Sequence, residues 1–253
     1  MSSVGVTVVI AARNEAANIA ACIDSVRWAR QIIVVEDGSS DDTASVATAV
    51  GALVLPNPFV TIGLQRNAAI ERAESDWILV IDADERGSMA LGEELTTILG
   101  APRFNAYRIP RTNFFLGREV KHGGWESDRP VRLFRSSLRY NADRVHEHVV
   151  TDGGVGDLKS PIAHEPYASL GSWFEKLGRY SRHWAEDRHD RGMRGGVGAV
   201  LVRPPLRFLT MYIVRGGWMD GARGAVLASM AATSVMAKYA WLWALGLTEA
   251  AGD

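Results

Sequence analysis

Three acidic side chains follow an apolar run within four residues, in the segment Ile81-Asp-Ala-Asp-Glu85. Carboxylates this dense at the end of a buried strand are costly unless a cation meets them. Their hard oxygen ligands suit Mg²⁺ or Mn²⁺, and the same ion could hold a substrate diphosphate. Because Asp-x-Asp alone is common, the position of this cluster in the fold decides whether it indicates a metal site.

A second chemical signal lies upstream, where the apolar run ending at Glu36 is followed by Asp37 and a Gly-Ser-Ser-Asp turn. A carboxylate at a strand tip can accept hydrogen bonds from a ribose hydroxyl or a base N–H, and nearby helix N-termini favour phosphate. Asp-Gly-Ser is also ordinary turn chemistry. Taken alone, Asp37 is therefore a weak signal. Together with the acidic cluster at 82–85 it becomes a strong one, and segment 11–15 ends the first apolar run in a similar way.

The elements that must position these residues alternate over the first hundred positions. Runs rich in β-branched residues predict strands at 6–10, 31–36, 52–55 and 77–82. Helical spacing predicts helices at 15–26, 42–50 and 63–73, the second capped from within 39–42. This order predicts an α/β fold with a parallel sheet, in which ligands bind beyond the carboxyl ends of the strands.

The rest of the chain has a different pattern. Residues 106–166 combine short runs, at 107–109 and 131–134, with loops that favour mixed strands completing an active site. Helical stripes follow at 172–190, 205–215 and 219–247, with a glycine-rich break at 192–198. We expect a catalytic domain at 1–168, with halves 1–100 and 101–168, and a helical C-terminal extension at 169–253.

Charge is unevenly distributed along the chain. The formal net charge of -1 argues against a nucleic-acid binder. Between residues 191 and 238, seven Lys and Arg stand against one acid, Asp220, among aromatic and apolar residues. This combination is typical of a segment on an anionic membrane surface, although helices that pack on the catalytic domain or form a homo-oligomer would also carry it. Segment 225–247 approaches spanning length, but Lys238 and several Ser and Thr interrupt it, so we expect an interfacial helix.

The single cysteine, Cys22, excludes an internal disulfide and a cysteine-ligated zinc site, and it fits a reducing compartment. The apolar run 6–10 is too short for the core of a signal peptide, and polar residues follow it at once. We therefore expect a cytoplasmic protein that is peripheral on the inner face of the cytoplasmic membrane.

A family resemblance is carried by several motifs together. Asn14-Glu15, the segment Glu36-Asp-Gly-Ser-Ser-Asp41 and Asp82-Ala-Asp84 resemble the nucleotide-binding half of family 2 glycosyltransferases, which have the GT-A fold, a Rossmann-like mixed sheet. Over nearly its whole length the chain also resembles the lipopolysaccharide core β-1,4-glucosyltransferase subgroup. That closer match rests on Gly123-Gly-Trp125, Asp128, Arg132-Leu-Phe-Arg135, Val145-His-Glu147 and His164, and more loosely on Arg207-Phe-Leu209 and Gly216-Gly-Trp-Met-Asp-Gly221.

The resemblance implies an inverting transfer of a sugar, glucose in that subgroup, from a UDP-sugar to a lipid-linked or lipopolysaccharide-type glycan. Asp37 would contact the uridine, Asp82 the ribose or sugar, and Asp84 a Mg²⁺ or Mn²⁺ ion. His164 could be a further metal ligand or a phosphate contact, or it could have a structural role. The donor-binding set is then Ala11, Arg13, Asn14, Glu15, Asp37, Arg66, Asp82 and Ala83, although Arg66 could instead be a surface helix arginine.

Inversion also needs a general base near the acceptor hydroxyl. Glu147 stands where relatives carry their catalytic acid, and Asp128 is the second candidate. If Glu147 were paired with Arg144 or His146, it would instead be structural. We expect His146 and Trp125 at the acceptor, since an indole face suits stacking on a sugar ring, although Trp125 could equally belong to the core.

Other functions fit the sequence less well. A sugar-phosphate nucleotidylyltransferase would carry a Gly-rich phosphate loop after the first strand, where this chain has Arg13-Asn-Glu15. A processive polysaccharide synthase would need clear membrane spans and usually a Gln-x-x-Arg-Trp motif, and the sequence offers neither. A non-catalytic binding or scaffold protein on the same fold and a transferase with a protein or peptide acceptor stay open as alternatives.

Overall fold

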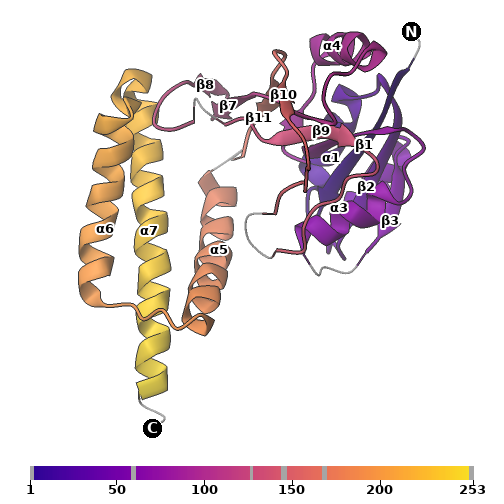
Figure 1. Ribbon diagram of the computed structural model, residues 1–253. Coiled ribbons are helices and arrows are strands. Elements are labelled where there is room, and N and C mark those ends of the chain that lie inside the picture. Colours follow the sequence, from indigo (N-terminus) through magenta and orange to yellow (C-terminus); the bar gives the residue numbers. More distant parts are fainter. Residues whose placement is uncertain (1–2, 58–60, 126–127, 144–146, 167–169, 251–253) are drawn as a thin grey trace. The chain divides into compact units, whose positions relative to one another are not determined.

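A computed structural model describes residues 3–57, 61–125, 128–143, 147–166 and 170–250 (Figure 1). The chain divides into two compact units, the first built from Met1–Thr112 and Asp128–His164 and the second from Asn113–Ser127 and Glu165–Asp253. The predicted boundary after residue 168 stays a prediction. The insert 113–127 belongs with the second unit, although it lies within the predicted catalytic half 101–168.

The first unit is built on a seven-stranded mixed sheet with the order β10-β6-β9-β4-β1-β2-β3. Its parallel part consists of β1 (Val4–Ala12), β2 (Ala29–Glu36), β3 (Leu53–Pro56) and β4 (Trp77–Asp82). Strand β9 (Val131–Arg135) runs antiparallel to both β4 and β6 (Ala106–Arg108), and β10 (Val155–Asp157) runs parallel to β6. All four strands predicted in the first hundred residues are confirmed, and the mixed sheet agrees with the predicted α/β class.

Helices cover both faces of this sheet. Alternate residues of β1 point to opposite sides, because side chains alternate along a strand. Val6, Val8 and Ile10 pack in one core with helices α1 (Ala16–Ser25), α2 (Thr43–Ala49) and α4 (Met89–Gly100). Val9 packs in a second core with α3 (Ile62–Ile70). The strands are therefore buried on both faces, as their nearly continuous apolar runs predict.

The register of the parallel strands brings their polar ends together. Ala11 at the end of β1 lies opposite Asp82 at the end of β4, and Ala12 lies opposite Glu36 at the end of β2. The polar residues that follow these three strands thus meet at one edge of the sheet. This is the edge at which ligands of parallel α/β sheets bind.

Short strands follow outside the main sheet. In the first unit, β5 (Glu85–Arg86) pairs antiparallel with β11 (Ile162–His164), and this register sets His164 opposite Glu85. Strands β7 (Arg111–Phe115) and β8 (Arg118–Val120) form a hairpin whose turn residues, Leu116 and Gly117, both have positive φ. Such a two-residue turn matches the twist of the paired strands.

The second unit is mainly helical. Helix α5 spans Leu170–Asp190, α6 spans Val197–Leu209, and α7 spans Gly221–Ala250. Between α6 and α7 lie a π-helical turn, η1 (Thr210–Val214), and a 3-10 turn, η2 (Gly217–Asp220). Both α5 and α6 pack against α7, which lies between them in Figure 1.

The predicted start of the second helical stripe at residue 205 is wrong, because α6 begins at Val197 and continues through Pro204 and Pro205. Only the first part of the predicted break at 192–198 is non-helical. Gly195 explains why the helix can begin so early, since a Cβ there would come within 2.7 Å of the backbone nitrogen of Trp243 in α7. Close packing on α7 thus outweighs the unfavourable propensity of Gly and Pro.

Two helical segments of the second unit are long and apolar enough to cross a membrane by length and composition. They are residues 197–214, with a mean hydropathy of 1.4, and residues 217–248, with a mean hydropathy of 1.2. Only 6% of the first segment and 22% of the second are buried inside the protein. Length and composition alone do not establish a span. The expectation of an interfacial helix at 225–247 therefore stays a prediction.

Candidate active site

Asp82, the last residue of β4, receives three arginines. One carboxylate oxygen lies 2.7 Å from the guanidinium of Arg66, and the other lies 3.2 Å from Arg111 and 2.5 Å from Arg132. Burial by itself would raise the pKa of Asp82, but Arg132, Arg66 and Arg111 outweigh burial and hold this pKa far below its ordinary value. Asp82 is therefore a fixed negative charge at the edge of the sheet.

Glu85 shares two of the same arginines. Its carboxylate lies 2.6 Å from Arg111 and 3.2 Å from Arg132, and it accepts a hydrogen bond of 2.7 Å from the backbone N–H of Asp82. Glu85 is fully buried, and this burial raises its pKa despite the arginines. The sequence predicted that a cation must meet the acidic cluster, and for Asp82 and Glu85 the cations are arginine side chains.

The two candidate bases are tied to Asp82 in the same way. The carboxylate of Glu147 lies 3.2 Å from Arg66, and that of Asp128 lies 2.9 Å from Arg111. Each arginine also contacts Asp82, so a single guanidinium bridges Asp82 to each candidate. The side chain of Glu147 is 23% exposed and that of Asp128 is 36% exposed, so both carboxylates can be reached from solvent.

The alternative role of Arg66 as a surface arginine is wrong, because its side chain is 7% exposed and bridges two carboxylates. Arg144 and His146, the partners that would have made Glu147 structural, lie outside the described residues. The same holds for the predicted acceptor contact of His146. Among the described residues, the partner of Glu147 is Arg66.

Helix α3 also holds the chain that leads to Glu147. The side-chain amide of Asn67 donates to the carbonyl of Tyr140 and accepts from its backbone N–H, with both hydrogen bonds at 2.9 Å. The guanidinium of Arg66 lies 5.1 Å from the centre of the Tyr140 ring. A Cβ on Gly63 would lie 2.5 Å from the carbonyl oxygen of Asn141, so the helix can approach this closely only with glycine at that position. We did not foresee Asn67 or Gly63 as positioning residues, since both resemble ordinary helix residues in the sequence.

The two predicted metal ligands lie beside each other. A carboxylate oxygen of Asp84 is 3.8 Å from Nε2 of His164, which the pairing of β5 with β11 brings to this edge. Burial, together with the nearby charge of Arg111, lowers the pKa of His164, so the ring is neutral at neutral pH and has the form that binds metals.

This pair fits a divalent cation that also binds a substrate. Among the described residues no group of three or more His, Cys, Asp and Glu could hold a metal ion. Two protein ligands leave coordination positions for diphosphate oxygens and water, as is common for Mg²⁺ and Mn²⁺. One oxygen and one nitrogen ligand favour Mn²⁺ over Mg²⁺, because imidazole is a softer ligand.

The ends of β1 and β2 are tied together by their own side chains. Arg13 forms an ion pair of 3.3 Å with Asp37, whose side chain is 10% exposed. Asn14 has a positive φ of 55°, and its side-chain oxygen accepts from the backbone N–H of Ser40 at 2.8 Å. The N–H of Glu15 donates to the hydroxyl of Thr43 at 2.8 Å. Arg13, Asn14 and Glu15 after β1 are therefore linked to residues that follow β2. Of the remaining predicted donor residues, Ala11 is half-buried at the end of β1, and Ala83, directly after β4, is buried.

Two acids in this region shape the loop. The carboxylate of Glu36 accepts hydrogen bonds from the backbone N–H groups of Gly38 and Ser39. Burial would raise the pKa of Glu36, but the hydrogen bonds from Ser39 and Gly38 outweigh burial and hold this pKa below its ordinary value. Asp41 accepts from the N–H of Thr43 in α2 and from the N–H of Ala16 in α1. The N-cap residue of α2 is Asp42, which lies within the predicted segment 39–42 but makes no capping hydrogen bond with its side chain. The neighbouring Asp41 instead accepts from the first N–H group of each helix.

Trp125, the predicted stacking residue for the acceptor, belongs to the second unit. It packs there against a core of Phe115, Val120, Trp173, Leu227 and Met230. Its indole N–H is buried and has no hydrogen-bond partner among the residues that the structure describes. The residues that precede Trp125 are anchored in the same unit, because Asp220 accepts hydrogen bonds from the N–H groups of Lys121 and His122.

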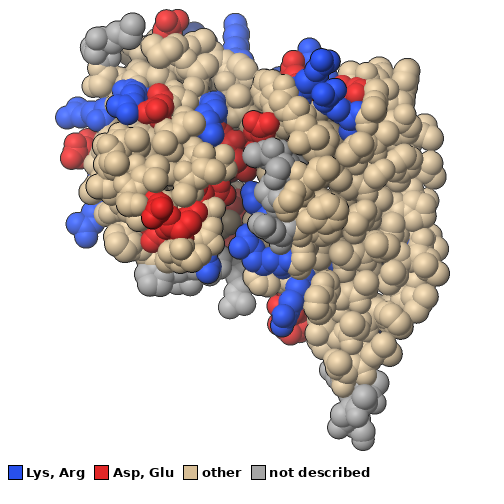
Figure 2. Space-filling view, turned by 180° about the vertical axis from the view of Figure 1, so that it is seen from behind, with Lys and Arg blue, Asp and Glu red and all other residues tan. Residues whose placement is uncertain are grey.

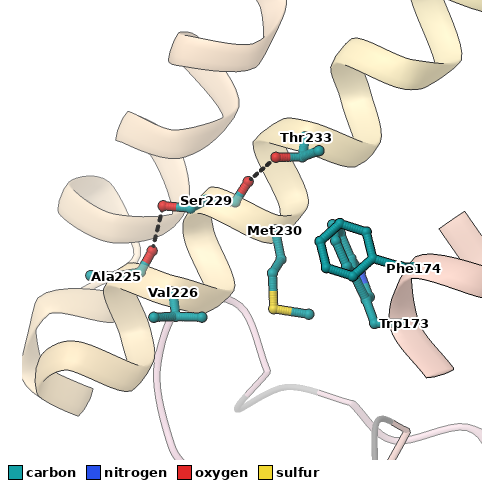
Figure 3. Close-up of a pocket in the computed structure, with 7 residues that line it drawn as sticks. All are labelled: Trp173, Phe174, Ala225, Val226, Ser229, Met230 and Thr233. Atoms are coloured by element: carbon teal, nitrogen blue, oxygen red, sulfur yellow. Dashed lines mark hydrogen bonds between the residues drawn. The ribbon is translucent and has the colours of Figure 1, made fainter. Parts of the chain in front are cut away.

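A groove of about 310 Å³ lies between α5 and α7 in the second unit (Figure 3). Its lining residues are Trp173, Phe174, Ala225, Val226, Ser229, Met230 and Thr233. Figure 3 shows that the hydroxyls of Ser229 and Thr233 are turned to carbonyls of their own helix, at 2.9 Å in both cases. Within the described lining the groove has no charged group, so it does not suit a nucleotide or a diphosphate.

Comparison with known proteins identifies one matching family and several relatives. The profile of glycosyl transferase family 2 matches residues 7–152. The lipopolysaccharide core biosynthesis glycosyltransferase LpsC of Rhizobium meliloti is 28% identical over 90% of this chain and 90% of its own length. An uncharacterized glycosyltransferase of Rickettsia conorii is 34% identical over 86% of this chain and 82% of its own length.

Solved structures with partial similarity also exist. Glucosyl-3-phosphoglycerate synthase from Mycobacterium tuberculosis, in complex with Mn²⁺, uridine diphosphate and product, matches with a TM-score of 0.37 and 23% identity. Mannosyl-3-phosphoglycerate synthase from Rubrobacter xylanophilus matches with a TM-score of 0.38 and 27% identity. The matches cover 43% of this chain, and 44% and 41% of the two solved chains.

Proposed function

The chain belongs to glycosyl transferase family 2 and has the GT-A fold of that family, and on this premise we propose that it is an inverting, metal-dependent hexosyltransferase. The donor is a UDP-sugar, with glucose as the sugar transferred. The observation that carries the proposal is the bridge from Asp82 through Arg66 to Glu147. It joins a carboxylate at the donor edge of the sheet to a solvent-accessible carboxylate that can act on an acceptor.

The donor nucleotide would lie over the ends of β1, β2 and β4. Asp37 would accept from the uracil or ribose, and Arg13 would then exchange its ion pair with Asp37 for a contact to the donor. The N-terminus of α1 follows directly after Glu15, and the positive end of its helix dipole favours a negatively charged group nearby. Asp82, held ionised by three arginines, would accept hydrogen bonds from the ribose or sugar hydroxyls.

Asp84 and His164 would hold the Mn²⁺ or Mg²⁺ ion together with the diphosphate. Such an ion stabilises the negative charge that grows on the diphosphate as the sugar departs. Three arginines, Arg66, Arg111 and Arg132, face four carboxylates in this part of the first unit. Since the arginines are matched by protein acids, the charge of the diphosphate would be neutralised by the divalent ion that Asp84 and His164 would hold.

Glu147 would act as the general base. The acceptor hydroxyl oxygen attacks the anomeric carbon, the bond from that carbon to the diphosphate oxygen breaks, and the hydroxyl proton passes to the Glu147 carboxylate. One displacement of this kind inverts the anomeric centre. Arg66 holds the carboxylate in place, and Asp128, held in the same manner by Arg111, is the alternative base.

The acceptor is proposed to be a lipid-linked glycan such as a lipopolysaccharide core. The proposal is supported by similarity to LpsC over nine-tenths of both chains. The protein would work as a peripheral protein on the cytoplasmic face of the membrane, held by the basic helices of the second unit, with Trp125 at the acceptor side. A homo-oligomer formed through the same helices is a compatible arrangement.

A panel of nucleotide-sugars tests the proposal directly. Thermal unfolding with each donor, with and without Mn²⁺, should show the largest shift for UDP-glucose with Mn²⁺, because a ligand that binds only the folded state stabilises it. Release of UDP on addition of a delipidated core glycan would then establish transfer. Binding of nucleotide-sugars without any release of nucleotide would contradict the proposal and favour a non-catalytic binding protein.

A further inference from the structure

Helix α6 presents an apolar face to the outside of the second unit. None of its residues is buried. The side of α6 that is turned outward carries Leu201, Val202, Leu206 and Leu209, which are between 45% and 67% exposed. The same face continues into η1 with Ile213 at 58%. An apolar surface of this extent is unusual on a protein surface that faces only water.

Helix α6 carries only two charged residues, Arg203 and Arg207, so neither of its sides resembles the polar face of a water-exposed helix. The half-buried positions 199, 200, 204, 207 and 208 lie on the side towards α7 and include Arg207. Arg203 is the single charged residue among the exposed positions of α6, all of which the structure describes, and its guanidinium lies 4.7 Å from the ring centre of Tyr239 in α7. A helix in water would turn its arginines outward and its leucines inward.

On the other side of α7 the unit carries charged residues, and these belong to α5. Helix α5 packs there, with Trp184 lying 5.2 Å from Tyr239 between ring centres. Arg182 and Glu186 form an exposed ion pair on α5 at 2.8 Å. Such a charged helix alongside α7 is incompatible with a bilayer surrounding the helices on all sides. The second unit therefore has one apolar side, at α6, and one polar side, at α5.

Basic residues stand at both ends of the apolar face. Exposed Arg194 precedes α6, and exposed Arg215 follows η1. Trp218, which is 58% exposed, comes next in η2. Arginine and tryptophan at the borders of an apolar segment match the anionic headgroups and the interfacial layer of a bilayer. Figure 2 shows the unit from behind, where the surface over α6 and α7 is broad and almost free of charged side chains.

We propose that α6 and η1 lie in the plane of an anionic bilayer, with Leu201, Val202, Leu206, Leu209 and Ile213 inserted among the acyl chains. This inference rests on the proposed function, because it gives the enzyme of a lipid-linked acceptor its mode of attachment. Insertion of apolar side chains, rather than attraction of arginines alone, carries the attachment. It therefore survives salt, which removes only the attraction between exposed charges.

Vesicle flotation of the full chain tests the inference. Vesicles of phosphatidylcholine with phosphatidylglycerol should bind the protein at low salt and still bind it at about 1 M salt, where the screening length falls to about 3 Å. The double substitution Leu201→Gln and Leu206→Gln should lower partitioning by roughly a hundredfold, since burial of one leucine side chain is worth tenfold or more. Hydrogen exchange of residues 197–214 should slow when vesicles are added.

The matched control is the double substitution Met89→Gln and Val150→Gln, which alters two equally exposed apolar residues of the first unit and should leave partitioning unchanged. The inference is overturned if salt abolishes wild-type binding, or if the leucine variant floats as the wild type does. It is likewise overturned if the chain is a lipid-free dimer that these substitutions dissociate and no vesicle binding occurs. UDP release with a delipidated acceptor is measured in parallel. If the wild-type protein releases no UDP in that assay, the proposed function is refuted, whatever the result of the vesicle experiment.

Discussion

At the edge of β4, Asp82 divides its two oxygens among three arginines, and two of those arginines continue to Glu147 and Asp128. The consequence is that neither candidate base is an isolated carboxylate. Each is held by a guanidinium that is itself fixed by Asp82. Loss of Asp82 would therefore disturb both candidates, whereas loss of either base would leave the other in place.

The choice between the two bases is the first residue-scale prediction. Glu147→Gln keeps the shape and a hydrogen-bond acceptor for Arg66 but takes no proton, so turnover should fall by roughly a hundredfold or more with donor affinity nearly unchanged. Asp128→Asn should cost much less. Steady-state kinetics of both variants test which carboxylate is the base, with a substitution of the exposed Glu119, Glu119→Gln, as control. A larger loss of turnover in Asp128→Asn than in Glu147→Gln would assign the general base to Asp128.

The metal pair gives the second prediction. Asp84→Ala should abolish the dependence of donor binding on Mn²⁺ while the protein stays folded, because Asp84 is the proposed oxygen ligand of the pair with His164. Isothermal titration with UDP, with and without Mn²⁺, measures this. Asp157→Ala serves as control, since that side chain is 55% exposed in the first unit. Full Mn²⁺ dependence in the Asp84 variant would show that the ion binds elsewhere.

At the scale of elements, α3 has a positioning role that no single motif signals. Arg66 and Asn67 are consecutive, so one turns to the carboxylates and the other to the backbone of Tyr140. Gly63, one turn earlier, allows the same helix to approach Asn141. The helix thus acts as a rigid support from which Glu147 is placed, and rigid elements hold reacting groups more accurately than loops.

The role of α3 as a support predicts that substitution of Asn67 lowers turnover. Asn67→Ala removes both hydrogen bonds to Tyr140 and should lower turnover by roughly tenfold or more, because small displacements of a catalytic group are costly. Donor affinity should change little. Asn67→Asp keeps the acceptor for the Tyr140 N–H and should be less affected in turnover. Equal donor-affinity losses in the two variants would indicate a general loss of folding instead, which circular dichroism would detect.

At the scale of the whole molecule, the net charge of -1 conceals a strong division. The first unit concentrates buried ion pairs at the edge of its sheet, and the second places its basic residues beside apolar and aromatic helices. The two units also have separate cores. Chemistry and attachment are therefore proposed to reside in different units.

This division predicts how the protein unfolds. UDP-glucose with Mn²⁺ at a hundredfold excess over Kd should stabilise the first unit by about 2.7 kcal/mol, which corresponds to roughly 5–10 °C in Tm. Differential scanning calorimetry should show this shift in one transition, while anionic vesicles should shift the transition of the second unit. A single transition that both ligands raise equally would mean that the two units unfold together.

Sequence alone was sufficient for the four strands of the first hundred residues and the acidic residues at their ends. Strand 77–82 could be recognised because its apolar run is continuous, and a strand buried on both faces requires such a run. Asp82, Asp84, Asp37 and Asn14 could then be placed at one edge, since parallel strands present their carboxyl ends together. The family resemblance adds the roles of Glu147 and His164, which no local pattern determines.

Only the tertiary structure decided which charges meet. Arg66, Arg111 and Arg132 are 16, 29 and 50 residues away from Asp82 in the chain, and they converge because β9 is inserted antiparallel beside β4 and α3 packs over the same edge. Likewise α6 starts before two prolines because α7 supports it. Local propensity depends only on a residue and its nearest neighbours along the chain. Ion pairs and helix packing depend on surfaces that form only when the chain has folded.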